Sequence, residues 1–254
     1  MDMQIIVLGM HRSGTSMLSK VLSNLGIEMG SDGVGKEIYN IEGHYEDGEM
    51  LALNKEILSY LGGGWDNLPN EEIVNKNKNY ILNKYLYFVS KKNGTWGVKE
   101  PRLSIFAHFL HQTLSNPKYI FMIRDELDVA KSLKARNNLT IKQGIDLKYQ
   151  YDEIIKSFLS DKEYLLIKYN ELQSNPREEL FRLSEFLGVE FNIKAISHIS
   201  DRKNMTIKKK KFLRSYFICS CKALILRPHY ILRLNSWILL KNYLLDLIQV
   251  YLKR

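Results

Sequence analysis

A loop near the N-terminus carries groups that suit phosphate binding. Gly9 and Gly14 have the spacing of a Walker A loop. Thr15 stands where a nucleoside triphosphatase has its lysine, and the cation comes earlier in the loop, as Arg12. Unpaired N–H groups at the start of the helix that follows attract an anion, as does the helix dipole. The loop is therefore predicted to bind a phosphate group without the Walker lysine.

A second candidate site for phosphate follows the apolar run 119–123. Arg124 comes directly after this run, and Ser132 follows roughly two helical turns later. The planar N–H donors of arginine fit a phosphate group, and the serine hydroxyl adds another donor. In a Mg²⁺-dependent kinase with a P-loop, an aspartate should end this strand and hold the metal. Asp125 is instead interpreted as a carboxylate at a helix N-terminus, so a small-molecule kinase is the disfavoured alternative.

The elements that must position these residues alternate along the chain. Apolar runs predict strands at 4–8, 96–99, 119–123 and 164–168. Helical periodicity predicts helices at 13–25, 46–61, 71–91, 103–114, 127–136, 141–159 and 177–187. This alternation predicts an α/β fold of three layers, with a central parallel sheet and helices on both faces. Ligands of such folds bind beyond the carboxyl ends of the strands, so the residues that follow strands are the candidates for function.

Several segments resemble one enzyme family. Arg12-Ser13-Gly14-Thr15-Ser16 resembles the 5′-phosphosulfate loop of sulfotransferases, in which carbohydrate-type members use Arg and cytosolic members use Lys. The strand with Arg124 and Ser132 resembles the 3′-phosphate motif of the same family. Further segments resemble the bacterial carbohydrate-type members: 43–47, 53–54, 96–102, 169–172 and 186–188. The resemblance covers roughly residues 5–188, with His44 and Glu100 as departures, since the family more often has an aromatic residue and an aspartate there.

The resemblance implies a cofactor and a set of site residues. The donor would be 3′-phosphoadenosine 5′-phosphosulfate and the product 3′-phosphoadenosine 5′-phosphate, with no metal ion required. The acceptor would be a hydroxyl group, carried by a glycan or another molecule. The predicted cofactor-binding residues are His11, Arg12, Ser13, Gly14, Thr15, Ser16, Arg124 and Ser132. The predicted catalytic residues are Arg12, Lys99 and the general base Glu46, for which Glu100, His44 and His11 are the alternatives.

Composition and charge complete the prediction. The chain has 254 residues, enough for one substantial core, and its net charge of +9 suits a polyanionic partner. We expect a sulfotransferase domain at 1–205 and a basic, amphipathic helical appendage at 206–254, which either packs on protein, including a second subunit, or lies on a membrane surface. The two cysteines and the absence of a signal-like start favour a cytoplasmic protein, which would be membrane-peripheral if the appendage lies on a membrane. We expect no nucleic-acid partner. A non-catalytic nucleotide-binding module stays open as an alternative.

Overall fold

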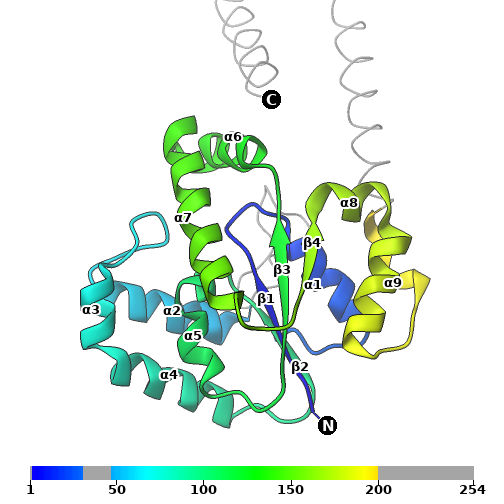
Figure 1. Ribbon diagram of the computed structural model, residues 1–254, viewed down its shortest axis with the longest axis horizontal. Coiled ribbons are helices and arrows are strands. Elements are labelled where there is room, and N and C mark those ends of the chain that lie inside the picture. The colour runs from blue at the N-terminus through cyan, green and yellow to red at the C-terminus, as the bar shows by residue number, and fades with distance from the viewer. Residues whose placement is uncertain (1, 31–46, 200–254) are drawn as a thin grey trace, which may run out of the picture. The chain divides into compact units, whose positions relative to one another are not determined.

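A central parallel sheet organises the computed structural model, which describes residues 2–30 and 47–199. In this part of the chain the strands are β1 (Gln4–Leu8), β2 (Trp96–Lys99), β3 (Pro117–Ile123) and β4 (Tyr164–Lys168). Their order across the sheet is β2-β1-β3-β4, and every pair is parallel (Figure 1). The predicted α/β class is therefore confirmed.

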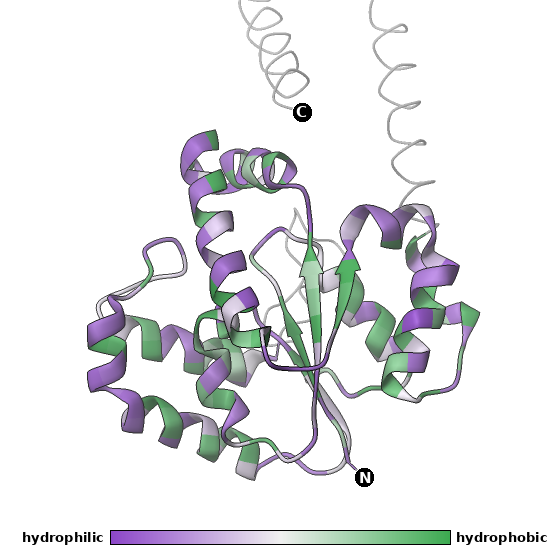
Figure 2. Cartoon of the chain, viewed as in Figure 1, coloured by the Kyte–Doolittle hydropathy of each residue, from purple (hydrophilic) through white to green (hydrophobic). Residues whose placement is uncertain are grey.

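Helices cover both faces of this sheet. The helices of the described residues are α1 (Thr15–Asn24), α2 (Gly48–Tyr60), α3 (Glu71–Lys76), α4 (Lys78–Ser90), α5 (Leu103–His111), α6 (Glu126–Asn137), α7 (Ile141–Leu159), α8 (Tyr169–Ser174), α9 (Pro176–Leu187) and the 3₁₀ helix η1 (Ile193–Ile196). Ile6 and Leu8 pack with α2 to α7 on one face, whereas Ile5 and Val7 pack with α1, α8, α9 and η1 on the other. Figure 2 shows the result, apolar strands between helices whose outer faces are hydrophilic. Successive strand residues point to opposite faces, so apolar residues on both faces require the three layers that are observed.

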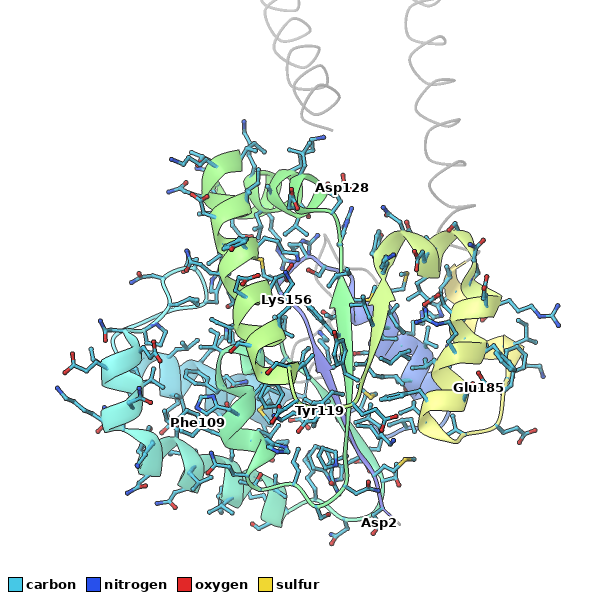
Figure 3. The ribbon with its side chains drawn as sticks, in the orientation of Figure 1. Asp2, Phe109, Tyr119, Asp128, Lys156 and Glu185 are labelled. Carbon is cyan, nitrogen blue, oxygen red and sulfur yellow. The ribbon has the colours of Figure 1, made fainter. Side chains whose placement is uncertain are left out.

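The connections create a switch point between β1 and β3. The chain leaves β1 into α1 on one face of the sheet, and it leaves β3 into α6 on the other. These two strands are neighbours, with Leu8 opposite Phe121. In Figure 3, Tyr119 marks the early part of β3 and Asp128 lies on α6, beyond the carboxyl end of that strand. Open α/β sheets bind their ligands in the crevice at such a point.

One expected helix is divided in two. The periodicity predicts a single helix over 71–91, but α3 ends at Lys76 and α4 starts at Lys78. Asn77 separates them with φ −106° and ψ 15°, and its side-chain amide donates to the carbonyl of Ile73 at 2.9 Å. An asparagine side chain that bonds nearby backbone groups competes with the helix, which accounts for the break.

Two short elements were not expected, and some predicted features fall outside the described residues. The six residues of α8 directly follow β4, and η1 has four residues. Segments this short show too little periodicity to be recognised from sequence.

The appendage at 206–254 lies outside the described residues, as do His44 and Glu46, so the boundary between 205 and 206 stays a prediction. No helix within 2–30 and 47–199 has the length and apolar character needed to cross a membrane.

Asp47 joins the start of α2 to the residues that follow α4 and provides a test of this packing. Its carboxylate accepts from the Met50 N–H at 3.0 Å and from Lys92 Nζ at 2.8 Å, and the residue is only 3% exposed. Replacing Asp47 by alanine should lower the free energy of unfolding by about 2–3 kcal/mol, because the helix loses its cap and a partly buried ammonium loses its partner. Urea unfolding measures this change. Asp47→Asn, which can still cap α2, should lose less, and an unchanged midpoint for Asp47→Ala would contradict the assignment.

Candidate functional site

The loop after β1 has the backbone shape of an anion-binding site. Met17 donates the first hydrogen bond of α1, to the Gly14 carbonyl at 2.9 Å. The N–H groups of Thr15 and Ser16 precede this bond and so have no acceptor within the helix. Arg12 and Gly14 have φ of 71° and 95°, in the left-handed region. A backbone in which left-handed residues alternate with other conformations turns successive N–H groups toward a common point, which favours a bound anion.

Close packing explains both glycines of the loop. A Cβ on Gly14 would overlap the ring of Tyr169, which follows β4. A Cβ on Gly9 would lie 2.7 Å from the Met122 carbonyl oxygen of β3, and the Gly9 N–H donates to Ser104 Oγ at 3.2 Å. Neither position has space for a side chain. The glycines therefore let the loop lie tightly against the ends of β3 and β4.

The two predicted phosphate motifs meet in space. Arg12 Nε donates to Ser132 Oγ at 2.8 Å, although 120 residues separate them. Arg124 Nη1 donates to the carbonyl oxygen of Arg12 at 3.3 Å. The loop after β1 and the residues after β3 thus form one cluster at the switch point.

The guanidinium of Arg124 is held by its neighbours. It lies over the Tyr169 ring, with its central carbon 4.3 Å from the ring centroid, and it pairs with the Asp128 carboxylate at 3.6 Å. Its Nε is buried and has no hydrogen-bond partner among the described residues. Asp125 accepts from the Asp128 N–H at 3.0 Å and caps α6, which confirms its interpretation as a helix N-terminal carboxylate. The Arg124 guanidinium is therefore held in a fixed plane, and its Nε–H donor has no acceptor among the described residues.

A buried lysine supports the loop from β2. Lys99 is fully buried, and its ammonium donates to Ser16 Oγ at 3.3 Å. Ser16 is half-buried, whereas Ser13 is buried and its hydroxyl has no partner in the described part of the chain. Ser16 is thus better placed than Ser13 to offer a hydroxyl to a ligand.

Glu100 is the centre of a buried polar network. Its carboxylate accepts from Asn54 Nδ2 at 2.7 Å and from the guanidinium of Arg102. The Tyr85 hydroxyl donates in turn to Asn54 Oδ1 at 2.6 Å. Burial, followed by the nearby charge of Glu100, raises the pKa of Tyr85 well above its usual value, so the phenol stays protonated. The Glu100 carboxylate is thus occupied by structural donors, which disfavours it as the general base.

His11 lies among cations. Burial lowers its pKa well below the usual value, and the positive charges of Arg102, Lys99 and Arg12 lower it further. The imidazole is therefore neutral at pH 7, and an added proton would meet these charges. Nε2 is buried and has no partner among the described residues, and the ring packs edge-on against Trp65, with centroids 4.8 Å apart. His11 is a weak candidate for a base, and the positive cluster around it suits a polyanion.

The match to a family model decides what kind of protein has this site. The model described as "Sulfotransferase family" matches residues 4–192. The chain belongs to the sulfotransferase family. Transferase chemistry is therefore established at the level of the family, and the P-loop-like form of the phosphate loop is consistent with it.

Among the solved structures found by comparison, one resembles this sulfotransferase in fold. The sulfotransferase domain from the curacin biosynthetic pathway is 19% identical, with a TM-score of 0.51 over 77% of each chain. The sulfotransferase domain of the Synechococcus PCC 7002 olefin synthase is 18% identical, with a TM-score of 0.49 over 77% of this chain and 76% of that one. A sulfotransferase from Mycobacterium avium is 17% identical, with a TM-score of 0.43 over 78% and 67%. Comparison with curated protein sequences gave no significant match.

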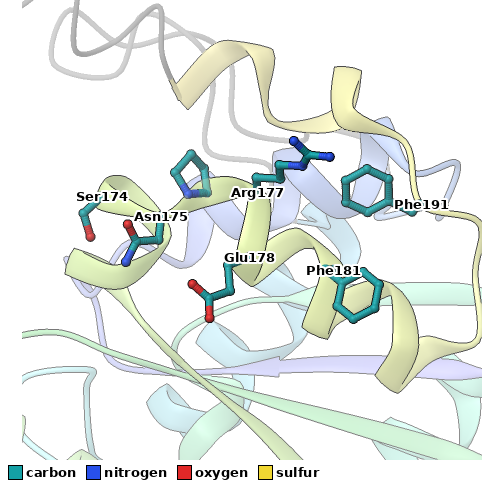
Figure 4. Close-up of a pocket in the computed structure, with 7 residues that line it drawn as sticks. Ser174, Asn175, Arg177, Glu178, Phe181 and Phe191 are labelled. Carbon is teal, nitrogen blue, oxygen red and sulfur yellow. The ribbon is translucent and has the colours of Figure 1, made fainter.

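A surface hollow among the described residues lies apart from this cluster. Figure 4 shows an open hollow beside α8 and α9, lined by Arg177, Glu178, Phe181 and Phe191 among others, and it contains none of the predicted site residues. No group of three or more His, Cys, Asp or Glu side chains in 2–30 and 47–199 could hold a metal ion.

Tyr169 was not among the predicted site residues, although its place directly after β4 is the signal that could have identified it.

Proposed function

We propose that this sulfotransferase takes its sulfuryl group from 3′-phosphoadenosine 5′-phosphosulfate and passes it to a hydroxyl acceptor. The hydrogen bond between Arg12 and Ser132 is the observation that carries the proposal. It joins the loop that suits a 5′-phosphate to the motif that suits a 3′-phosphate. A nucleotide with phosphate groups at the 3′ and 5′ positions of its ribose matches these two adjacent anion-binding features.

The residues present fit this cofactor. The first-turn N–H groups of α1 and the Arg12 side chain would hold the 5′-phosphosulfate, at the loop whose left-handed residues Arg12 and Gly14 turn its N–H groups toward a common point. The buried, unpartnered Nε and the fixed plane of Arg124 suit the 3′-phosphate, with Ser132 beside it. When bound, the nucleotide supplies an activated sulfuryl group on a phosphate that leaves as an anion.

The chain itself contributes alignment and charge. Sulfuryl transfer resembles phosphoryl transfer, in which positioning and electrostatic stabilisation supply most of the catalysis. Arg12 would stabilise charge on the departing phosphate, and Lys99, held at the loop through Ser16, would add a second positive charge. Glu46, which lies outside the described residues, is the proposed base that takes the proton of the acceptor hydroxyl. The proposal that this hydroxyl belongs to a carbohydrate rests on the family resemblance, and mass spectrometry of glycan pools incubated with the donor tests it.

The Arg124 side chain tests the choice of donor. Arg124→Ala should weaken binding of 3′-phosphoadenosine 5′-phosphate by about 1.5–3 kcal/mol, the range for hydrogen bonds to charged groups, or roughly 10–150-fold. Titration calorimetry of the bisphosphate and of adenosine 5′-phosphate measures this difference, and the affinity for adenosine 5′-phosphate should change little. Arg124→Lys is the matched control, which keeps the charge without the planar donors. Equal affinity of the wild type for the two nucleotides would count decisively against the proposal.

A further inference from the structure

We propose that Trp65 determines acceptor specificity, by stacking against the apolar C–H face of the sugar ring that carries the acceptor hydroxyl. The indole lies on the loop between α2 and α3, which Figure 1 shows beside α7. The inference rests on the proposed function, because it assigns a role in the same site. One contact places this residue beside the phosphate loop, and a second joins its backbone to α7.

The first contact is with the phosphate loop itself. The rings of Trp65 and His11 meet edge to face at 62°, with centroids 4.8 Å apart. His11 directly precedes Arg12, the proposed ligand of the 5′-phosphosulfate. In the proposed site, the indole thus contacts the same loop that would hold the sulfuryl group, and the attacking hydroxyl must approach that loop.

The second contact leads to the end of β2. The hydroxyl of Tyr151, a fully buried residue of α7, donates to the Trp65 carbonyl oxygen at 2.8 Å. Burial and the nearby charge of Glu100 raise the pKa of Tyr151, so the phenol keeps the proton that it donates. The Trp65 backbone is thus tied to α7 through a residue that feels the charge of Glu100.

The loop that carries Trp65 has a defined backbone. The Gly63 N–H donates to the Leu58 carbonyl oxygen at 2.9 Å, and the Gly64 N–H donates to that of Asn67 at 2.7 Å. A Cβ on Gly63 would lie 2.8 Å from the backbone nitrogen of Pro69, so the loop folds back closely on itself. These contacts fix the backbone that carries the indole before any acceptor binds, which lowers the entropy lost when the loop binds an acceptor.

The chemistry of the surroundings indicates what Trp65 could bind. The cations whose charges act on His11 are Arg102, Lys99, Arg12 and Arg136, which suit the donor's negative charges. Trp65 packs partly against the core and stays half-buried, so it adds apolar surface to a polar, positive site. Aromatic surface with a few polar groups is typical of sites that orient small molecules. A ring with an apolar face, either a sugar or a phenol, could stack there, and the carbohydrate acceptor proposed above favours the sugar.

Kinetics of three variants test the inference. The acceptors are a panel of methyl glycosides, a panel of phenols and a panel of linear alcohols, each with a saturating sulfate donor. Trp65→Ala should raise the KM for methyl glycosides about 5–50-fold, and Trp65→Phe should recover most of this loss, because a ring face remains. The affinity for 3′-phosphoadenosine 5′-phosphate should stay within about twofold of the wild type, because the substitution removes a contact with the acceptor and none with the nucleotide. Tyr60→Ala, at an aromatic residue that is 60% exposed at the end of α2, is the control and should behave as the wild type.

The outcomes separate this inference from the proposed function. A wild type that fails to bind the bisphosphate overturns the proposed function. A wild type that binds it but sulfates only linear alcohols, or none of the three panels, overturns the role of Trp65. A Trp65→Ala effect confined to phenols overturns the choice of a sugar, and an unchanged KM for glycosides overturns the stacking contact. Thermal unfolding of each variant checks the fold, and Trp65→Phe keeps the test valid if Trp65→Ala does not fold.

Discussion

Replacing Arg12 by alanine should reduce kcat by about 10²–10³-fold, the usual loss when one preorganised donor to a developing anion is removed. The Arg12 guanidinium is fixed before substrate binds, because its Nε donates to Ser132 Oγ at 2.8 Å. Such a donor stabilises the departing phosphate without reorganising during the reaction. Single-turnover measurement of sulfuryl transfer gives the effect on chemistry, and bisphosphate affinity gives the effect on binding.

Arg12→Lys is the control for this variant. Arg12 has a φ of 71°, and lysine and alanine both carry a Cβ, so neither substitution changes the type of backbone strain. Lysine keeps the charge but loses the planar donors that contact Ser132. We expect Arg12→Lys to retain more activity than Arg12→Ala, since cytosolic sulfotransferases use lysine at the matching position of this loop. Equal rates for the wild type and Arg12→Ala, where chemistry limits turnover, would remove Arg12 from the proposed mechanism.

Replacing Glu46 by glutamine should lower kcat by about 10²–10⁴-fold with little change in nucleotide affinity, because the variant keeps the shape and loses the proton acceptor. The structure of the described residues disfavours two alternatives to Glu46 as the base, Glu100 and His11. The Glu100 carboxylate is occupied by Asn54 and Arg102, and burial together with the neighbouring cations holds the pKa of His11 well below its usual value. His44 lies outside the described residues together with Glu46 and remains the next candidate.

The comparison variants for Glu46 distinguish a base from a helix-terminal carboxylate. Asp47 is the residue that caps α2, so the helix keeps its cap in Glu46→Gln and the unfolding midpoint should move little. Glu100→Gln should instead lower stability, because the partly buried Arg102 guanidinium would lose its ion pair. A Glu46→Gln enzyme with a near-wild-type kcat would reject the assignment and bring His44 and Glu100 forward.

The sequence by itself determined the class of fold and the position of the phosphate motifs. Strands at 4–8, 96–99 and 164–168 have the bounds that the apolar runs predict, because strands buried on both faces must be apolar throughout. The rule that ligands bind beyond the carboxyl ends of parallel strands then selected Arg12 and Arg124, which follow strands, and Lys99, which ends one. Each of these inferences depends only on local pattern and on chain order.

Only the tertiary structure decided which side chains touch. The bond from Arg12 to Ser132 spans 120 residues, and the network that occupies Glu100 joins α2, α4 and the end of β2. No local pattern distinguishes a carboxylate engaged by buried donors from one free to accept a proton, because the difference lies in what packs around it. The same holds for Trp65, whose place beside His11 follows from the way the loop after α2 folds against α7. Long-range packing therefore sets the roles of residues whose types alone leave several open.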